Sequence, residues 1–341
     1  MSQIKIDIDG VLGLIILNSP ATLNSLSHED ILAIKTGLDN HEKDTSVKAI
    51  IIKSSTDKAF CAGGDMKQIH RNISAANFDA INHFFVDEYA LNLAISECTK
   101  PYIAVMHGIT MGGGMGVSVH GTHRIVTETS LLAMPESRIG FFPDVGASYF
   151  LPRLPYRAGY WMGLTATSIG AAEALTLGLA THYIKSDDLG NLNERLNTSL
   201  SDQSVASGQT THQLVQTTLD TMSSPMANAD VLNTLKQREI WFADNDAKAI
   251  ERRLSGSAAG GGTEDSSADA QHLLDLLLAG SPHSTDITLE LFAAAEGKTL
   301  AQCLELELAL CAKAVRHPDC AEGVRAVLVD KDKSPKWAAL R

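Results

Sequence analysis

The chain has 341 residues, of which 44% are hydrophobic, enough for two domains or for one core with a long extension. Its formal net charge of -12 and isoelectric point of about 5.4 argue against nucleic acid or an anionic membrane as the main partner. Five scattered cysteines form neither a CxxC pair nor a Cys/His ligand spacing, so we expect no disulfide framework and no zinc site.

The N-terminal segment does not have the pattern of a secretory signal. Met1 leads directly into isoleucines that alternate at positions 4, 6 and 8, and no apolar run approaches membrane-spanning length. We therefore expect a cytoplasmic protein that does not act on a membrane.

The first half of the chain alternates between strand and helix patterns. Apolar residues alternate on both sides of Asp9-Gly10, which predicts a β-hairpin. Ser27 and Asp30 are typical of a helix start, and a buried strand is predicted over 47–53. The later elements expected from periodicity are a helix over 78–93, a strand over 102–106, a helix from 113, and strands over 124–126 and 131–133.

The second half is predicted to be mainly helical. After a helix over 171–179 and a short strand over 182–184, the strand patterns stop. We therefore place an α/β core that carries the active site in residues 1–190 and a mainly helical region in 191–341. Ser255 to Thr263 have the composition of a flexible loop. We expect this loop to separate two helices near residues 255–270. A leucine-rich helix from 300 ends near His317-Pro318 and is expected to pack on the core or on another subunit.

Two glycine-bearing stretches are the first candidates for a site. Ala59 to Asp65 (AFCAGGD) and Met111 to Gly116 (MGGGMG) each follow a strand-like run and precede a helical pattern. The backbone N–H groups of Gly64 and Gly113 are therefore candidate donors to a developing oxyanion. The alternative that either stretch is only a tight turn without a function remains open. Dinucleotide binding is disfavoured because the second stretch lacks the early-chain βαβ setting and the following acidic residue.

Acidic residues downstream are the second group of candidates. Glu136 follows Pro135 between apolar runs, so partial desolvation makes it a candidate base or nucleophile, with an exposed loop acid as the alternative. Asp144 is a second candidate acid, with a helix cap as the alternative. Glu88 on local evidence belongs to a solvated helix face. No catalytic role is assigned to the remaining nearby candidates, His107, His120, His123, Ser118 and Cys61.

At these residues the chain resembles the enoyl-CoA hydratase/isomerase (crotonase) superfamily, in which A-F-x-A-G-x-D and a later G-G-G segment form the oxyanion hole for a CoA thioester. Within it, the chain is most similar to the 3-hydroxyisobutyryl-CoA hydrolase family. The similar segments are His107–Gly121, Ala133–Glu136, Phe142–Gly146, Tyr149–Leu154 and Glu322–Trp337. The resemblance spans nearly the whole chain and is weakest over 190–270.

The resemblance implies a fold and a set of site residues. The expected fold is an α/β spiral of repeated strand-strand-helix turns, followed by helices that cover the site or mediate contacts in a trimer or hexamer. Gly64 and Gly113 would form the oxyanion hole, and Glu136 and Asp144 would be catalytic. Glu88 would bind the substrate near its hydroxyl, together with Gly113, Glu136 and Asp144.

The implied reaction is hydrolysis of an acyl-CoA thioester, with (S)-3-hydroxyisobutyryl-CoA from valine breakdown as the expected substrate and 3-hydroxypropionyl-CoA as a second one. CoA is part of the substrate, and no metal or other cofactor is expected. Hydratases of the superfamily carry a second glutamate where this chain has Gly116, which argues against hydration. A dienoyl-CoA isomerase shares the Glu–Asp pair and remains an alternative, and a non-catalytic binding protein is a third. Whether Glu136 acts as nucleophile or as general base stays open.

Overall fold

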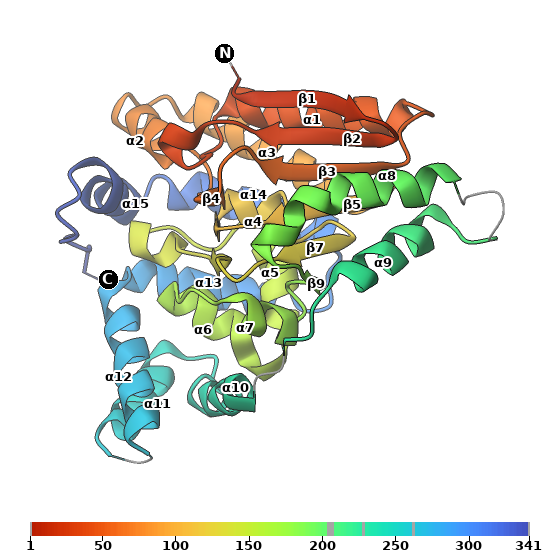
Figure 1. Cartoon of the computed structure of the whole chain (residues 1–341). Helices are drawn as coiled ribbons and strands as arrows, with labels where there is room; N and C mark the ends of the chain where they lie inside the picture. Colours follow the sequence, from red (N-terminus) through yellow and green to blue (C-terminus); the bar gives the residue numbers. More distant parts are fainter. Residues whose placement is uncertain (1, 203–207, 227–228, 261–262, 340–341) are drawn as a thin grey trace. The chain divides into compact units, whose positions relative to one another are not determined.

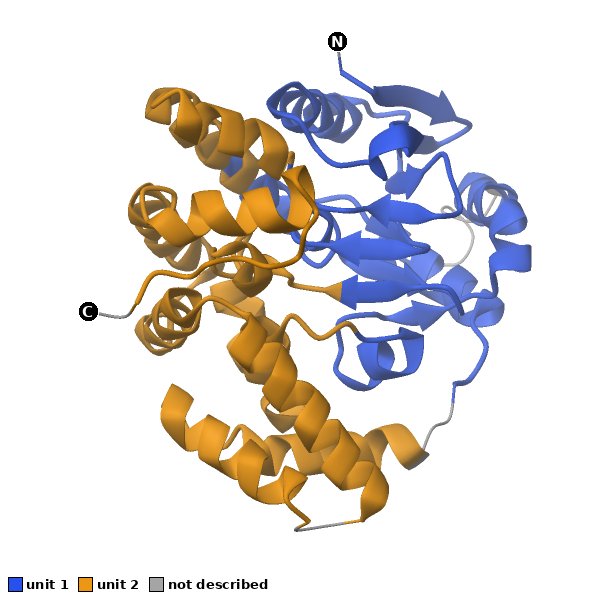
Figure 2. Ribbon diagram, turned by 90° about the vertical axis from the view of Figure 1, so that its left-hand side faces the viewer, with its two compact units in different colours: residues 1–64, 90–132, 169–227 blue, residues 65–89, 133–168, 228–341 orange. Residues whose placement is uncertain are grey.

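A computed structural model describes residues 2–202, 208–226, 229–260 and 263–339 (Figure 1). The chain divides into two compact units whose segments alternate along the sequence. Unit 1 comprises residues 1–64, 90–132 and 169–227, and unit 2 comprises residues 65–89, 133–168 and 228–341 (Figure 2). The predicted boundary at residue 190 stays a prediction.

A six-stranded sheet forms the centre of unit 1, in the strand order β1-β2-β3-β5-β7-β9. Its strands are β1 Ile4–Asp9, β2 Leu12–Leu17, β3 Ala49–Ser54, β5 Tyr102–Met106, β7 His123–Val126 and β9 His182–Tyr183. β1 and β2 pair antiparallel around the predicted Asp9-Gly10 turn, and the other neighbours pair parallel. Parallel strands need crossover connections, and helices supply several of them.

Helices α8 and α9 cover one face of this sheet within unit 1. Leucines of α8 (Leu192–Asp202) and apolar residues of α9 (Thr211–Met222) join strand side chains such as Ile51, Ile103 and Ile125 in one buried cluster. Figure 1 shows these two helices in green beside the strands. The other helical elements of unit 1 are η1 Pro20–Thr22, α1 His28–Lys43, the end of α3 (Phe78–Glu97), α4 Gly113–Gly116, α7 Ala171–Thr176 and η5 Ser186–Asn191.

A second, three-stranded sheet carries the glycine stretches. Its order is β4-β6-β8, with β4 Ala59–Cys61, β6 Ile109–Met111 and β8 Leu131–Ala133. β4 and β6 pair parallel, so their carboxyl ends, and the segments that follow them, lie on the same side of the sheet. α2 (Met66–Ser74) follows the first stretch and α4 follows the second.

Unit 2 consists mainly of helices. Its elements are α2, the first half of α3 (Phe78–Glu97), η2 Glu136–Ile139, α5 Ala147–Phe150, η3 Leu151–Arg153, η4 Pro155–Arg157, α6 Ala158–Thr165, α10 Ala229–Trp241, α11 Ala247–Ala258, α12 Glu264–Ala279, α13 Pro282–Ala294, α14 Leu300–Ala314, α15 Pro318–Val324 and η6 Arg325–Val329. Every residue of α6 is buried, which identifies this helix as the core element of the unit.

The structure agrees with most of the expected elements and shortens several. The strand predicted over 102–106 is present without change, and Ser27 and Asp30 form the predicted capping box of α1. The helix predicted from 113 is a single turn, and α7 ends at Thr176. α11 continues through Ala258 and α12 begins at Glu264, so the loop predicted near 255–270 is much shorter, and residues 261–262 lie outside the described part. None of the described helices is long and apolar enough to cross a membrane.

Candidate active site

The two glycine stretches lie against each other within unit 1. Gly63 has a φ of +101°, a left-handed conformation that favours glycine, and a Cβ placed there would lie 3.2 Å from the Met111 carbonyl oxygen and 3.5 Å from the Gly113 nitrogen. A Cβ on Gly114 would lie 2.4 Å from the Cys61 carbonyl oxygen. The glycines are therefore needed for the close approach of the β4 and β6 ends.

This approach leaves two backbone donors near one another. Gly113 is the first residue of α4, a position whose N–H has no acceptor inside the helix. Within the described residues, neither the Gly113 N–H nor the Gly64 N–H donates a hydrogen bond, while the Gly63 carbonyl accepts one from Leu26. Two unused N–H groups beside each other are the elements of an oxyanion hole.

A cluster of buried carboxyl groups lies in unit 2. Glu88 on α3, Glu136 at the start of η2 and Asp144 before α5 are 2%, 6% and 5% exposed. Burial raises the pKa of Asp144 to about 7, against hydrogen bonds that lower it. Burial, and then the charge of Asp144, also raise the pKa values of Glu88 and Glu136 well above the ordinary range. The three acids therefore lie within electrostatic range of one another, and they cannot all be ionised near neutral pH.

Hydrogen bonds satisfy only part of this cluster. The Tyr89 hydroxyl donates to Asp144 Oδ2 at 2.8 Å and lies 2.9 Å from Cys311 Sγ. Burial raises the pKa of Tyr89 well above its ordinary value, so its hydroxyl stays protonated. In contrast, Glu88 Oε1 and Glu136 Oε2 are buried and make no hydrogen bond within the described residues. Such orphaned oxygens are costly in a folded protein, and a polar ligand would satisfy them.

The structure overturns three of the alternative interpretations from the sequence. Glu88 does not belong to a solvated helix face, since it is almost fully buried. Glu136 is not an exposed loop acid. Asp144 does not cap a helix with its side chain, because α5 has Gly146 at its N-cap and no side-chain cap, and the Asp144 carboxylate accepts from Tyr89.

Several residues to which the sequence analysis assigned no catalytic role form structural hydrogen bonds. His107 Nδ1 lies 2.8 Å from the Thr127 hydroxyl, and the Ser118 hydroxyl donates to the Gly114 carbonyl one turn earlier. The Cys61 thiol donates to the Asn24 carbonyl. All five cysteines are free thiols. Among the described residues, no group of three or more His, Cys, Asp or Glu side chains is arranged to hold a metal ion.

Sequence reasoning missed Tyr89 and Glu307. Tyr89 follows Glu88 directly, and nothing in a helical pattern marks its hydroxyl as a partner of Asp144. Glu307 is fully buried on α14 and accepts hydrogen bonds from Gly146 and Ser148. Its signal was available, because it occupies the apolar stripe of α14, at helical spacing from Leu304 and Cys311.

Comparison with known proteins defines the class to which this fold and site belong. The model of the enoyl-CoA hydratase/isomerase family matches residues 12–341, and the chain belongs to this family. The predicted crotonase-like α/β fold is thereby confirmed. Two solved structures with 30% identity and TM-scores of 0.86 agree: a carnitinyl-CoA dehydratase from Mycobacterium thermoresistibile, covering 98% of this chain and 91% of that one, and an enoyl-CoA hydratase from Rhodobacter sphaeroides 2.4.1, covering 99% and 93%.

More particular similarity comes from curated relatives. The mitochondrial 3-hydroxyisobutyryl-CoA hydrolase of Bos taurus is 40% identical over 98% of this chain and 84% of its own length. The human protein of the same name is 39% identical with the same coverage. The 3-hydroxyisobutyryl-CoA hydrolase 1 of Arabidopsis thaliana is 35% identical over 100% of this chain and 88% of its own. The predicted resemblance to this hydrolase family is therefore confirmed.

Proposed function

We propose that this protein is an enzyme that hydrolyses an acyl-CoA thioester, and that its substrate is 3-hydroxyisobutyryl-CoA, which gives 3-hydroxyisobutyrate and CoA in valine breakdown. The name shared by relatives that align over almost the whole chain supports the substrate. The observation that carries the chemistry is the buried carboxyl cluster, in which Glu88 Oε1 and Glu136 Oε2 have no hydrogen-bond partner among the described residues.

In this proposal the N–H groups of Gly64 and Gly113 polarise the thioester carbonyl. They donate to its oxygen and stabilise the negative charge of the tetrahedral intermediate. Removing one donor of an oxyanion hole typically costs roughly 2.7 to 4 kcal/mol of transition-state stabilisation. The donors are backbone groups held by the contact between two glycine stretches, so their positions change little during reaction.

Glu136 and Asp144 carry the covalent and proton-transfer steps. In its ionised form, Glu136 either attacks the carbonyl carbon to form a mixed anhydride, which water then cleaves, or takes a proton from the attacking water. On either path the carbon–sulfur bond breaks and the thiolate gains a proton. On the general-base path water's oxygen enters the product acid, and on the anhydride path it enters the product acid or the Glu136 carboxylate, according to which carbonyl carbon water attacks. A pKa of about 7 suits Asp144 to hold and release that proton near neutral pH.

Glu88 is proposed to bind the hydroxyl group of the acyl chain. Burial keeps Glu88 protonated to a higher pH than usual, so its carboxyl group can both donate and accept a hydrogen bond. A substrate hydroxyl would satisfy the orphaned Oε1. This assignment predicts discrimination against acyl chains without a 3-hydroxyl, since such chains leave buried polar atoms unpaired.

The remaining expectations are also proposals. CoA serves as part of the substrate, no separate cofactor is needed, and nucleic acid and membranes are not partners. A trimer or hexamer is proposed from the superfamily. The cytoplasmic location stays a proposal for cell fractionation to test, because several relatives are named as mitochondrial proteins.

Release of free thiol from 3-hydroxyisobutyryl-CoA tests the function directly. A hydrolase produces one free thiol per turnover, whereas an enoyl- or dienoyl-CoA isomerase or a hydratase returns CoA still esterified. We expect thiol release from 3-hydroxyisobutyryl-CoA and 3-hydroxypropionyl-CoA, and much slower release from butyryl-CoA. Conversion of an unsaturated acyl-CoA without thiol release would replace the hydrolase by the isomerase or hydratase, and binding without any turnover would favour a binding protein.

A further inference from the structure

Glu307 is a buried acid of unit 2 that the proposed chemistry does not use. It lies on α14, is fully buried, and has no cationic partner in the described hydrogen bonds and ion pairs. Its Oε2 accepts from the Gly146 N–H at 2.7 Å. Its Oε1 accepts from the N–H of Ser148 at 2.9 Å and from the Ser148 hydroxyl at 2.5 Å. All three donors belong to the segment that directly follows Asp144.

This segment needs external support because its backbone is strained. Val145 has a φ of +55° and Gly146 a φ of +84°, so two consecutive residues are left-handed. A β-branched residue in this region is strained and persists only where surrounding contacts fix it. α5 has no side-chain cap of its own, and the Glu307 carboxylate satisfies two of its first N–H groups from outside.

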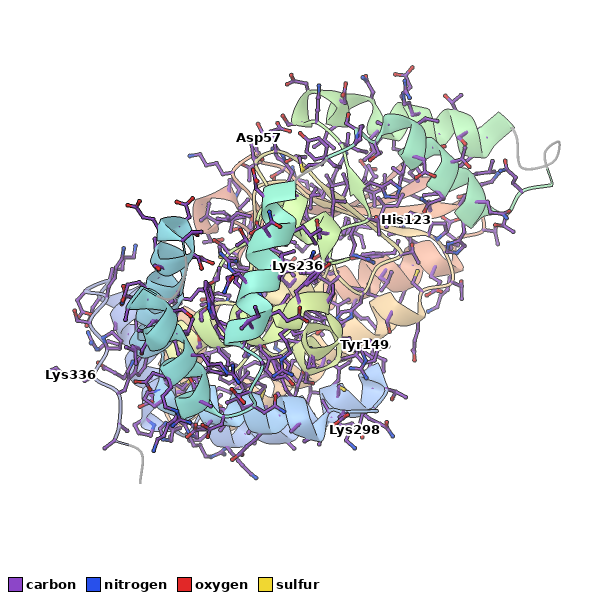
Figure 3. All side chains as sticks on the ribbon, turned by 90° about the horizontal axis from the view of Figure 1, so that it is seen from below. Asp57, His123, Tyr149, Lys236, Lys298 and Lys336 are labelled. Carbon is purple, nitrogen blue, oxygen red and sulfur yellow. The ribbon has the colours of Figure 1, made fainter. Side chains whose placement is uncertain are left out.

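The short helix η3, which follows α5, is bonded to the loop before α14. The Arg153 side chain lies over the ring of Tyr149, 4.1 Å from its centroid, and donates to the Lys298 carbonyl oxygen at 2.8 Å. Figure 3 labels Tyr149, which lies on α5, and Lys298, which lies in the loop before α14. The segment from Gly146 to Arg153 is thus bonded to Glu307 of α14 at its start and to the loop before α14 at its end.

The same face of α14 reaches the Asp144 side chain by a second route. Cys311 is one helical turn after Glu307, and its sulfur lies 2.9 Å from the Tyr89 hydroxyl. That hydroxyl donates to Asp144 Oδ2. Glu307 therefore supports the backbone that follows Asp144, and Cys311 supports the hydrogen-bond donor to its carboxylate.

We propose that Glu307 is a positioning residue for the reaction: it fixes the strained segment after Asp144 and thereby holds the Asp144 carboxylate in its working orientation. The expected effect of Glu307 on the reaction rate rests on the proposed function. Its effect on the segment after Asp144 does not depend on that function. Glu307 does not need to touch the substrate. A displacement of about 1 Å at a reacting group can lower a rate by about 100-fold, which sets the size of the expected effect.

The electrostatic coupling between the two acids agrees with this role. Burial, with a smaller effect from the charge of Asp144, raises the pKa of Glu307 to about 8, against the lowering by the Ser148 hydroxyl and the Gly146 N–H. The other titratable groups that interact with Glu307 are Tyr89, Cys303 and Cys311. Loss of the Glu307 carboxyl group would therefore alter the titration of Asp144 as well as its position.

The test compares E307Q with L304A. The amide of E307Q cannot accept from both N–H groups, whereas Leu304 is a buried apolar residue of the same helix whose side chain accepts no hydrogen bond. For E307Q we expect kcat to fall by 10- to 100-fold, KM to change less than threefold, and the pH profile to shift. For L304A we expect lower stability with kcat within twofold of wild type.

Hydrogen exchange of the amides in residues 145–149 provides a readout that does not require activity. We expect at least tenfold faster exchange there in E307Q, and unchanged exchange in L304A. A folded E307Q protein with wild-type exchange and wild-type kcat would overturn the proposal. If E307Q does not fold, S148A removes one of the three donors and is expected to accelerate the same exchange; unchanged exchange in S148A then overturns it. An inactive wild-type protein would refute the proposed hydrolysis, while the exchange data would still decide the role of Glu307.

Discussion

The hydrogen bond from Tyr89 to Asp144 gives a quantitative prediction about pH dependence. Tyr89→Phe removes the hydroxyl that donates to Asp144 Oδ2 at 2.8 Å and leaves the ring in place. A hydrogen bond to a charged group contributes about 1.5–3 kcal/mol, and one pKa unit corresponds to about 1.36 kcal/mol. The pKa of Asp144, about 7 in the wild type, should therefore rise by roughly one to two units in Y89F.

The direction follows from the causes of the wild-type value. Burial raises the pKa of Asp144, and the hydrogen bond from Tyr89 lowers it by favouring the ionised form. When the Tyr89 hydroxyl is removed, burial still raises the pKa of Asp144 and this hydrogen bond no longer lowers it. The limb of the pH–rate profile that reports Asp144 should then move to higher pH, whether the reaction needs its ionised or its protonated form. Because Asp144 and Glu136 interact, the measured value belongs to the pair.

The assay is the rate of CoA release from 3-hydroxyisobutyryl-CoA between pH 5 and 10, with products separated after quenching. Tyr102→Phe is a matched control: Tyr102 is equally buried and its hydroxyl donates to the Val117 carbonyl at 3.0 Å, in unit 1. We expect Y102F to lose about 1 kcal/mol of unfolding free energy without a shifted limb. A folded Y89F protein whose profile coincides with that of the wild type would refute the role assigned to this hydrogen bond.

Three further predictions concern the acids and the glycine turn. Glu136→Gln should lower kcat by about 100-fold or more with KM almost unchanged, and retained turnover would remove Glu136 from the mechanism. The pKa values of Asp144 and Glu307 rise to about 7 and 8, so the contribution of these two groups to the unfolding free energy should be complete below about pH 4 and lower by several kcal/mol at pH 8, because they ionise first in the unfolded chain. Chemical denaturation at several pH values tests this, and E307Q should flatten the slope. Gly114→Ala should destabilise the protein by about 1–3 kcal/mol or more, since its Cβ would lie 2.4 Å from a backbone oxygen of β4. Gly190→Ala, with open space around it, should change the stability little, and equal effects of the two would contradict the close approach.

The elements that the sequence predicts well are those whose signal is local. The Asp9-Gly10 turn and the β5 strand depend on short-range patterning, and both are present as expected. Helix ends are less well predicted: the helix from Gly113 stops after one turn, and three of its four residues are glycines, which are poor helix formers. The order of the strands in the two sheets follows from crossover connections that no local pattern contains.

Candidate residues could be chosen from the sequence, but their environments could not. Glu88 has the local pattern of a solvated position on α3, and only the packing of unit 2 makes it a buried acid with an orphaned oxygen. Burial raises its pKa most, and the charges of Asp144 and Glu136, about fifty residues away along the chain, raise it further. The family resemblance supplied this residue, where periodicity alone argued against it.

The support of Asp144 illustrates why such information is absent from local patterns. Tyr89 is 55 residues before Asp144, and the bonds from Gly146 and Ser148 to Glu307 span 161 and 159 residues. The leucine pattern of α14 correctly indicates a buried face, but it cannot tell a packing surface from one that also carries hydrogen-bond acceptors. The buried face of α14 holds Leu304, Glu307 and Cys311 together. An acid in an apolar stripe must find buried donors or be destabilising, so the stripe itself predicts that a distant backbone segment depends on this helix.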